Sequence, residues 1–499
     1  MKKTFLKISS LCDKYLIFAL LVSIFAFFVG RSLLNHYMFN THSWDLGLYS
    51  QQTWLYSQLS ATYNTVRGTN LLSDHFGITL FLLAPIYKIF PRAETLLILQ
   101  AILVTLSALP LYLITKKMFK SALAGSIIVF AYLSSSGIRE AINFDFHLAT
   151  IAVFFYAFFL YFWLNKKYVW SIVFVILAML CKEDVPLYVA FTALGLITQD
   201  LKNKRNFMYS TWLFIGSLMS FVAIMKIMLM VPATSANFNY FSFGYLGDNY
   251  ADVLKNLFTH PVIILKKTWE GFITNPTKVA TFKTYFYGFW YLPLLSFDIM
   301  IFSIPFLITK FASDRMPQWL LTGQYSVIGM FVLALATAYS ISRISRYLKF
   351  SRAMLITILT IFLIFTIKYN VITMAKPYWN VFSKQKWQQT NQFDGLNNFM
   401  KKIPDDASVG TQDQIVPHLA SRKDIYVVRC KYCIAPEDIN FDYILLDDRF
   451  DIGFNPRNES EFRAVIDENV TEQHDFEITD IDQAEDHTTY LLKNIKKNL

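Results

Sequence analysis

Asp45 is the residue in this sequence that most directly suggests chemistry. It lies in "THSWDLGLYSQQTW" at residues 41–54, just after the first apolar segment of the chain. A carboxylate at the end of a membrane span is costly unless it faces a cavity or a partner, and such a carboxylate can act as a general base towards a hydroxyl group. Asp45 could equally be the N-cap of the helix that follows it. The sequence leaves both roles open.

A further set of polar residues shares this position at the ends of apolar segments. The topology derived below puts all of them on the same face of the membrane. Because ionisable groups at span ends are functional candidates, we expect these residues to converge. They are Asp74, His75, Arg139, Glu140, Asp145, His147, Lys182, Glu183, Asp184, Gln324 and Tyr325.

All of these residues except Asp145 also have a simpler structural explanation. Asp74 could cap the next helix, and Arg139 with Glu140 could form a surface ion pair. The other structural alternatives are interfacial histidines with satisfied hydrogen bonds at His75 and His147, a self-neutralising turn in "KED" at 182–184, and aromatic-belt positions at Gln324 and Tyr325.

The composition identifies the kind of protein that must position this cluster. Of the 499 residues, 54% are hydrophobic and only 16% are charged. Soluble domains carry about 25% charged residues, so this is a polytopic membrane protein. The net charge of +10 fits basic cytoplasmic loops better than nucleic-acid binding.

Basic clusters between the apolar segments predict the topology. If all of them are cytoplasmic, the N-terminus lies inside and the multi-pass chain sits in the plasma membrane. The basic clusters are "MKKTFLK" at the start, "KKMFK" at 116–120, "NKK" at 165–167, "KNKR" at 202–205 and "SRISRYLKFSR" at 342–352. The eleven apolar segments are 15–37, 76–90, 94–115, 121–137, 146–164, 168–181, 185–199, 208–230, 286–311, 325–343 and 353–371.

Two of these apolar segments cannot be ordinary spans if the basic clusters share one side. Segment 76–90 contains Pro85 and is short for a crossing, so we expect a re-entrant or interfacial helix on the outer side. Segment 286–311 contains Pro293 and Pro305 and must return to the side that it left. Two short, broken helices or a hairpin would achieve this, and such helices are tolerated where protein buries them or where they line a cavity.

The last quarter of the chain differs from the rest because it is acidic and has no apolar span. We expect a transmembrane domain at 1–375 with outer loops at 38–75 and 231–285, followed by a small soluble extracytoplasmic α/β domain at 376–499. Its predicted strands are "ASVGTQ", "DIYVVR", "FDYILLDD" and "TYLLKN", with a helix at "IVPHLASR". Cys430 and Cys433 in "CKYC" could be a local disulfide, a free pair or half of a metal site.

Several long motifs follow one another in a distinctive order. They are "WDLGLYSQQTW", "SDHFGITLFLLAPIYKIFPRAETLLILQAILVTLSALPLYLITKKMF", "FDFHLATIAVFFYAFFLYFWL", "LCKEDVPLYVAFTALGL", "GQYSVIGMFVLALA", "IPDDASVGTQDQIVPHLASRKDIYVV" and "FDYILLDD". Their order and spacing resemble an uncharacterised family of polytopic membrane proteins within the GT-C glycosyltransferase superfamily. The resemblance covers nearly the whole chain and is weakest over residues 200–285.

The resemblance implies a GT-C-like fold and a polyprenyl-phosphate-linked sugar donor used on the outer face. Characterised GT-C enzymes carry an acid in the first outer loop that serves as general base or metal contact, and Asp45 matches it. Asp145 corresponds to the acid of the next outer loop. Lys182 corresponds to a lysine at the outer end of a later span, which often faces the lipid phosphate. His147, in "DFH", is a feature of the uncharacterised family itself.

These correspondences lead to a hypothesis for a membrane glycosyltransferase. Asp45 is the expected base, Asp145 with His147 would hold the acceptor or a divalent cation such as Mg or Mn, and Lys182 would bind the donor phosphate. A metal, if there is one, would lie at Asp45 and Asp145. The other expected substrate-binding residues are His75, Glu183, Gln324 and Tyr325. A lipid or solute transporter, or a non-catalytic scaffold or assembly protein, is the alternative.

Overall fold

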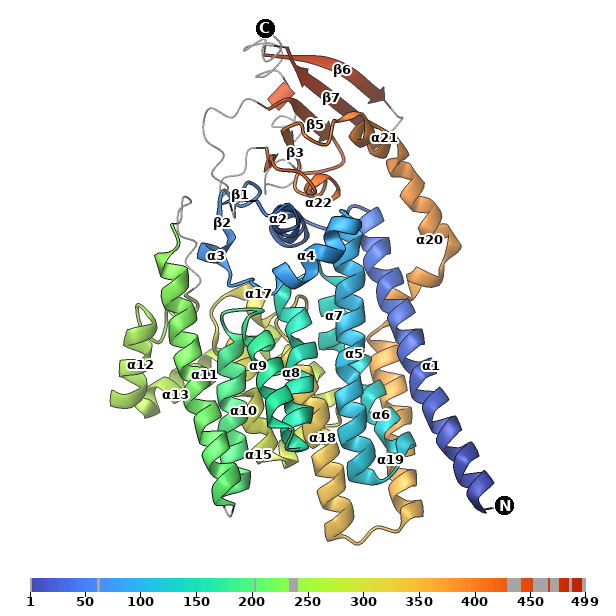
Figure 1. Cartoon of the computed structure of the whole chain (residues 1–499), viewed down its shortest axis with the longest axis vertical. Coiled ribbons are helices and arrows are strands. Elements are labelled where there is room, and N and C mark those ends of the chain that lie inside the picture. The colour runs from blue at the N-terminus through green and yellow to red at the C-terminus, as the bar shows by residue number, and fades with distance from the viewer. Residues whose placement is uncertain are drawn as a thin grey trace.

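The computed structural model describes residues 2–60, 63–201, 203–232, 241–428, 441–451, 465–466, 475–483 and 487–495. Within these residues the helices form a bundle, and a five-stranded sheet lies at one end of that bundle (Figure 1). The main helices of the bundle are α1 (Lys2–Tyr37), α5 (Ala93–Phe119), α6 (Ala122–Leu133), α7 (Ser136–Asn143), α8 (Leu148–Leu164), α9 (Tyr168–Met179), α10 (Val185–Asp200), α11 (Lys204–Met230), α18 (Val327–Tyr347) and α19 (Arg352–Thr366).

The described residues include five helices that are long and apolar enough to cross a membrane. They correspond to α1, α5, α11, α18 and α19, and there are up to six if α6 and α7, bent by 51°, form one span. Each predicted apolar segment coincides with a helix or with a run of short helices. How many of the eleven cross the bilayer stays a prediction, because several, such as α8 and α9, are shorter.

The expected non-crossing helix corresponds to α4 (Leu80–Ile89), which has ten residues and contains Pro85. A helix of that length is about 15 Å long, half the thickness of a bilayer core. Leu80, Leu83 and Tyr87 on its inner face are buried, whereas Phe81, Leu82 and Ile89 are exposed. The one-sided burial and the short length agree with an interfacial or re-entrant helix.

The apolar segment 286–311 is broken, as its prolines predict. It consists of short helical turns, and Pro293 and Pro305 each lie in the first turn of one of them. Trp290 and Tyr291, which lie between the end of α14 and the first of these turns, have positive φ angles of 58° and 54°. The helices in this part of the chain are α14 (Pro276–Tyr287), η2 (Leu292–Leu295), α15 (Phe297–Met300), η3 (Ile301–Ser303), α16 (Ile304–Leu307), η4 (Ile308–Ala312) and α17 (Met316–Trp319).

The two ends of the bundle differ in charge. The N-terminus and the α10–α11 and α18–α19 connections lie at the end opposite the sheet (Figure 1). These are the places where the basic clusters at 202–205 and 342–352 occur. The arrangement agrees with basic turns on a single side of the membrane.

The C-terminal part of the chain forms the five-stranded sheet in the order β4-β3-β5-β7-β6. Strand β3 pairs in parallel with β4 and β5, and β7 pairs antiparallel with β5 and β6. The elements are η5 (Ile367–Thr373), η6 (Lys376–Phe382), α20 (Lys384–Gln388), η7 (Gln389–Phe393), α21 (Asp394–Lys402), β3 (Val409–Thr411), α22 (Val416–Leu419), β4 (Ile425–Val427), β5 (Tyr443–Asp447), β6 (Phe476–Gln483) and β7 (Thr488–Asn494).

All four predicted strands and the predicted helix of this part are present as β3, α22, β4, β5 and β7. Strand β6, "FEITDIDQ", was not predicted because its side chains are mostly exposed and three of them are acidic, so it lacks the alternation of a half-buried strand. Cys430 and Cys433 lie outside the described residues.

The outer segments between the main helices fold into short elements. They are η1 (Ser43–Gly47), α2 (Leu48–Ser57), β1 (Tyr63–Asn64), β2 (Thr69–Asn70), α3 (Leu71–Asp74), α12 (Tyr250–Thr259) and α13 (Pro261–Ile273). One contiguous hydrophobic cluster runs from the bundle through this region into the sheet, because it includes Leu46 and Tyr49 as well as Val409, Val416 and Ile425. The segment that follows α1 and the C-terminal part therefore share one core.

Candidate functional site

Asp45 lies in η1, a single π-helical turn between α1 and α2. Its carboxylate is 23% exposed, and its Oδ1 atom lies 3.8 Å from Nε2 of His147. Within the described residues no donor hydrogen-bonds to this carboxylate. Burial raises the pKa of Asp45 to about 6, although the positive charges of His75, His42 and Lys182 oppose the rise.

His147 is fixed at the N-terminus of α8. Its Nδ1 atom accepts a hydrogen bond of 3.0 Å from the backbone N–H of Ala149, so the ring caps the helix. The neutral ring must then carry its proton on Nε2, which lies 3.3 Å from the hydroxyl of Tyr49. Burial lowers the pKa of His147 well below its usual value, with Lys182 and His75 adding to the effect. His147 therefore presents an N–H group towards Asp45 and Tyr49.

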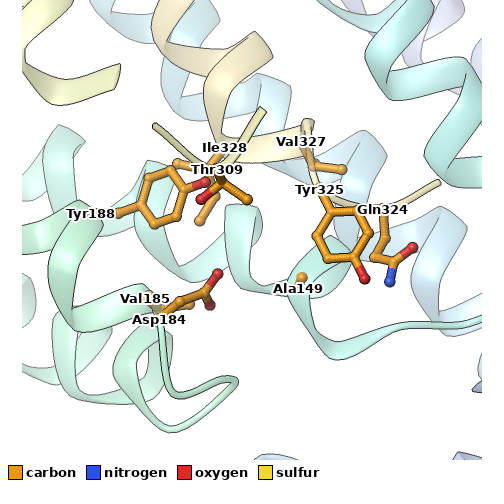
Figure 2. Close-up of a pocket in the computed structure, with 9 residues that line it drawn as sticks. All are labelled: Ala149, Asp184, Val185, Tyr188, Thr309, Gln324, Tyr325, Val327 and Ile328. Carbon is orange, nitrogen blue, oxygen red and sulfur yellow. The ribbon is translucent and has the colours of Figure 1, made fainter. Parts of the chain in front are cut away.

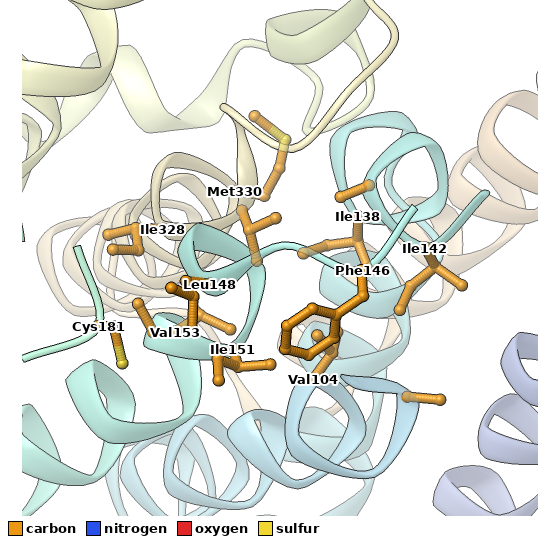
Figure 3. Packing of buried hydrophobic residues seen from close by; sticks show 14 of the residues in the cluster. Val104, Ile138, Ile142, Phe146, Leu148, Ile151, Val153, Cys181, Ile328 and Met330 are labelled. Atoms are coloured by element: carbon orange, nitrogen blue, oxygen red, sulfur yellow. The ribbon is translucent and has the colours of Figure 1, made fainter. Parts of the chain in front are cut away.

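The loop that carries Asp145 and His147 is hydrogen-bonded to helix α5. Gln100 of α5 donates to the backbone oxygen of Asp145 over 3.3 Å and accepts from the backbone N–H of His147 over 2.9 Å. Phe146 between them is fully buried close to Val104 and Ile142 (Figure 3). The hydrogen bonds of Gln100 and the burial of Phe146 thus fix the loop that carries Asp145 and His147.

Lys182 is at the centre of the second group, in the turn between α9 and α10. Its Nζ atom lies 3.8 Å from both Glu183 Oε1 and Asp184 Oδ2, and 5.4 Å from the centre of the Tyr325 ring. Burial lowers the pKa of Lys182, but the charges of Asp184 and Glu183 outweigh burial and raise it. His75 Nδ1 lies 3.3 Å from Glu183 Oε1. Lys182 is thus a buried cation whose charge two carboxylates largely balance.

A small pocket adjoins this second group (Figure 2). Figure 2 shows Gln324 and Tyr325, which precede α18, on one side, with Asp184 and Tyr188 on the other. Its volume is about 20 Å³, enough for about one water molecule. A larger group must therefore bind at its mouth or move the side chains around it.

Asp145 lines a larger, polar cavity of about 340 Å³. Its Oδ2 atom accepts a hydrogen bond of 2.8 Å from the backbone N–H of His42. Burial, together with the charges of Asp45 and Asp413, raises the pKa of Asp145 to about 8 against the opposing effect of His42. The cavity is lined by Arg31, Asn35, Asn40, His42, Glu140, Asn143, Phe144, Asp145, Thr322 and Gly323. Amide and charged groups dominate this list, which favours a ligand rich in hydroxyl groups over an apolar one.

Arg139 and Glu140 are not the surface pair that the sequence suggested. Their side chains are 3% and 6% exposed, and Arg139 NH2 lies 3.8 Å from Glu140 Oε1. Tyr378 donates its hydroxyl to the Glu140 carboxylate over 2.7 Å, and the guanidinium groups of Arg31 and Arg139 lie 5.1 and 5.2 Å from the Tyr378 ring centre. The expectation failed because it assumed an exposed loop, whereas α7 is packed between α1 and η6.

Two of the capping alternatives are also wrong. The N-cap of η1 is His42 and that of α2 is Gly47, so Asp45 caps neither helix. Asp74 does not cap α4, whose N-cap is Thr79; its carboxylate pairs with Arg67, with 3.3 Å between Oδ2 and Nε.

His42 and Asp413 are site residues that sequence reasoning missed. His42 Nδ1 lies 2.7 Å from Asp413 Oδ2. Burial lowers the pKa of His42, but the hydrogen bond and the charge of Asp413 outweigh burial and raise the pKa to about 9. His42 lies three residues before Asp45, so the sequence alone could have identified it as a polar candidate for the same site. Asp413 lies 371 residues further along the chain than His42, and no local pattern connects them.

Asp45 interacts electrostatically with two groups of the predicted residues. The charge of Asp45 acts on Lys182 in one group and on Asp145, together with His42, in the other. Glu183, His75 and Tyr325 gather around Lys182, with Gln324 across the small pocket.

The described residues contain no group of three or more His, Cys, Asp or Glu side chains arranged to hold a metal ion. The lone pair of His147 is used by its cap, and both oxygens of Asp413 are used by His42 and Ser43. An ion such as Mg²⁺ typically binds through one or two carboxylates, waters and a substrate phosphate, so the residues that would hold such an ion are Asp45 and Asp145.

Comparison with known proteins agrees with the membrane fold. The structure of ArnT from Cupriavidus metallidurans bound to undecaprenyl phosphate is 11% identical, with a TM-score of 0.53, over 96% of this chain and 97% of that one. ArnT in the apo state is 10% identical with a TM-score of 0.46, over 95% and 98% of the two chains. No curated protein matches the sequence significantly.

The fold likeness to ArnT extends over nearly the whole of both chains, so the bundle and the C-terminal sheet are both part of an ArnT-like fold. Residues 35–477 match the family described as "Predicted membrane protein (DUF2079)". This confirms the family resemblance inferred from the sequence motifs. Because that match spans most of its length, the chain belongs to the DUF2079 family of predicted membrane proteins.

Proposed function

We propose that this protein is a membrane glycosyltransferase that moves a sugar from a polyprenyl-phosphate-linked donor to an acceptor on the outer face of the membrane. The observation that carries the proposal is the position of Asp45. Its carboxylate has a raised pKa and no hydrogen-bonded donor within the described residues. It interacts electrostatically with the buried Lys182 and with His42 and Asp145, which line a polar cavity. A base, a cation for a leaving phosphate and a place for a hydroxylated acceptor are the parts that such a transfer needs.

The fold likeness supports the choice of a lipid-linked donor. The ArnT structure that shares this fold was solved with undecaprenyl phosphate bound. A lipid phosphate needs both an apolar groove for its tail and positive charge at its head. The last of the broken turns, η4, lies beside Tyr325, since Thr309 and Tyr325 line the same small pocket. Irregular helices of this kind are tolerated where they line a cavity.

The proposed chemistry uses Asp45 as general base. Its carboxylate takes the proton of the acceptor hydroxyl while that oxygen forms a bond to the anomeric carbon of the donor sugar. The bond from this carbon to the phosphate oxygen breaks, and the leaving polyprenyl phosphate keeps the electron pair. The ammonium group of Lys182 stabilises the negative charge that develops there. A divalent ion at Asp45 and Asp145, if bound, would add Lewis-acid stabilisation of the phosphate.

Asp145 takes a different role from Asp45 because its environment differs. With a pKa of about 8 it is protonated at neutral pH, so it can donate a hydrogen bond to the acceptor in the polar cavity. His147 orients Asp45 through its Nε2–H group. His75 and Glu183 set the position and charge of Lys182, and Gln324 and Tyr325 line the donor side. In this arrangement the N-terminus is cytoplasmic, and the tail at 376–499 is extracytoplasmic.

The proposal is tested first by finding the lipid. The full chain, extracted in mild detergent, is examined by native mass spectrometry beside Lys182→Ala. A retained polyprenyl-phosphate species that is lost in Lys182→Ala is the expected result. The matched control is Lys278→Ala, because Lys278 is another buried lysine, whose ammonium contacts the backbone oxygens of Phe311 and Ser313 rather than the site.

The outcomes separate the proposal from its rivals. Retention of the lipid in Lys278→Ala but not in Lys182→Ala locates the phosphate at Lys182. Equal retention in both variants removes Lys182 from donor binding. Preparations that keep ordinary phospholipids but never a polyprenyl phosphate contradict a lipid-linked donor and favour a transporter or a scaffold protein.

A further inference from the structure

We propose that the C-terminal tail is a working part of the site: Asp413 and Val416 clamp the two ends of η1 and so position the carboxylate of Asp45. The role of Asp45 as base rests on the proposed function, whereas the clamp itself does not. Asp413 and Val416 are positioning residues, since they act on the site through the η1 backbone.

The first half of the clamp holds the start of η1. Asp413 follows β3, and its side chain is 6% exposed. Its Oδ1 atom accepts hydrogen bonds from the Ser43 backbone N–H, over 2.9 Å, and from the Ser43 hydroxyl. Its Oδ2 atom accepts a hydrogen bond of 2.7 Å from His42 Nδ1. One carboxylate therefore fixes three donors that belong to the two residues at the beginning of the turn.

The second half holds the end of η1. A Cβ atom at Gly47 would come within 2.8 Å of Cγ1 of Val416, the first residue of α22. Gly47 has helical angles, φ −62° and ψ −50°, which any residue adopts, so its backbone does not require glycine. Glycine is required at this position because Val416 of the tail approaches so closely. Val416 is fully buried and its branched side chain has one preferred rotamer in a helix, so it cannot easily give way.

The tail is docked by further contacts that leave η1 itself untouched. Thr65 donates its hydroxyl to the backbone oxygen of Ile425 over 2.7 Å and accepts from its N–H over 3.0 Å, which satisfies the edge strand β4. The hydroxyl groups of Tyr87 and Ser421 form a hydrogen bond of 2.8 Å. These bonds mean that loss of the clamp can be studied without release of the whole tail.

The turn needs this external support because of its own geometry. A π-helical turn is rare, and it occurs mostly as a single turn next to α-helical residues and frequently at functional sites. The hydrogen bond between the Gly47 N–H and the His42 oxygen, 3.1 Å long, closes the turn on residues that Asp413 and Val416 hold. Movement of the tail would therefore move Asp45 relative to Lys182 and to the polar cavity.

The experiment uses hydrogen–deuterium exchange of the full chain in detergent, without substrate. Peptides that cover residues 42–52 are compared among wild type, Gly47→Ala, Asp413→Asn and the double variant Gly47→Ala/Val416→Ala. Exchange should become about tenfold faster or more in the two single variants, because local opening then costs less. It should return most of the way to wild type in the double variant, in which the smaller residue makes room for the new methyl group.

Two controls keep the result specific. Asp480→Asn removes an exposed carboxylate of the same tail, which pairs with Lys402 over 2.6 Å, and should leave the 42–52 peptides unchanged. Val416→Ala alone is the comparison for the double variant: it removes the contact with Gly47 but keeps Asp413, so exchange in the 42–52 peptides should rise, though by less than in Gly47→Ala. Wild-type exchange in Gly47→Ala, or no recovery in the double variant, overturns the clamp.

A second readout follows Asp45 directly. A carbodiimide modifies protonated carboxyl groups, so labelling of Asp45, measured by mass spectrometry, should fall as pH rises through about 6. The charged groups that act on Asp45 are His75, His42, Lys182 and Asp413, in decreasing order. In Asp413→Asn, His42 loses the partner that keeps it protonated. Loss of the positive charge of His42 raises the pKa of Asp45 by more than loss of the weaker negative charge of Asp413 lowers it, so the labelling midpoint should move to higher pH. An unmoved midpoint with faster exchange means that Asp413 only stabilises the loop.

This design separates two failures. If the clamp is wrong, hydrogen exchange in the 42–52 peptides is the same in Gly47→Ala and Asp413→Asn as in wild type, whether or not the protein transfers a sugar. If the proposed function fails, Asp45→Asn leaves sugar transfer unchanged while the exchange results can still show the clamp.

Discussion

Nε2 of His147 lies 3.8 Å from Oδ1 of Asp45, while Nδ1 of the same ring caps helix α8. One side chain thus links the stability of a helix to the surroundings of the proposed base. Because the cap fixes which nitrogen carries the proton, the group turned towards Asp45 is always a donor in the neutral ring. The two functions of His147 can be separated by substitution.

His147→Asn should keep the cap and lose the N–H near Asp45. Asparagine is among the best N-cap residues, so thermal stability should fall only slightly, whereas transfer should drop about tenfold. The comparison is His147→Ala, which loses both cap and donor and should be less stable by about 1 kcal/mol or more. Transfer rates and unfolding temperatures in detergent measure the two effects. Equal transfer by wild type and His147→Asn would remove the ring from the site.

Asp45→Asn should lower transfer by about 10²–10⁴-fold, the usual contribution of one general base. The carboxylate has no hydrogen-bonded partner within the described residues, so the folded state loses little, and the unfolding temperature should stay within a few degrees of wild type. The rate of polyprenyl-phosphate release in proteoliposomes is the measurement. Asp480→Asn serves as the matched control because that acid is exposed on the tail. A wild-type rate in Asp45→Asn excludes Asp45 as the base.

A plot of the transfer rate against pH should be bell-shaped. Asp45, with a pKa of about 6, must lose its proton to act as base, so activity should rise as pH increases through about 6. Asp145, with a pKa of about 8, must keep its proton to donate, so activity should fall again through about 8. A pH profile of the rate constant with saturating donor measures both limbs.

The variant Asp145→Asn assigns the alkaline limb. An amide N–H replaces the carboxylic O–H as a donor that does not titrate near pH 8. Activity should therefore persist at neutral pH, and the fall above pH 8 should disappear. An alkaline limb that remains in Asp145→Asn belongs to another group, with His42 as the next candidate because its pKa is raised to about 9.

Glu140→Gln should destabilise the bundle strongly. The carboxylate accepts the hydroxyl of Tyr378 and balances the charge of the buried Arg139. Removal of one charge of a buried pair typically costs about 3–5 kcal/mol, because the other charge is left uncompensated. Thermal unfolding in detergent measures the loss. Glu270→Gln removes an exposed i, i+4 pair with Lys266 and should change stability by less than about 1 kcal/mol; similar effects of the two would contradict a buried charge network.

Local sequence patterns predicted the elements that depend on local physics. Proline positions located the broken turns at 286–311, shortness identified α4, and alternation found β3, β4, β5 and β7. Polar residues at span ends identified Asp45, Asp145 and Lys182 as neighbours in one site. What these patterns share is that the cause lies within about ten residues of the effect.

The parts that were not predictable depend on contacts between distant segments. Asp413 looks like an ordinary loop acid until His42 and Ser43 are placed beside it. Arg139 and Glu140 look like surface residues until α7 is packed against Tyr378, which lies 238 residues after Glu140 in the sequence. Gly47 looks like a flexible residue although its angles are those of a regular helix.

The long sequence separation between Ser43 and Asp413, 370 residues, has a consequence for biosynthesis. Ribosomes add about 5–20 residues per second, so Ser43 emerges roughly 20–70 s before its partner exists. During that interval the turn that bears Asp45 has neither of its two anchors. In the proposed mechanism the site is therefore completed late, and a nascent chain already inserted in the membrane cannot transfer sugar until residues 413–416 have been made and have reached Ser43 and Gly47.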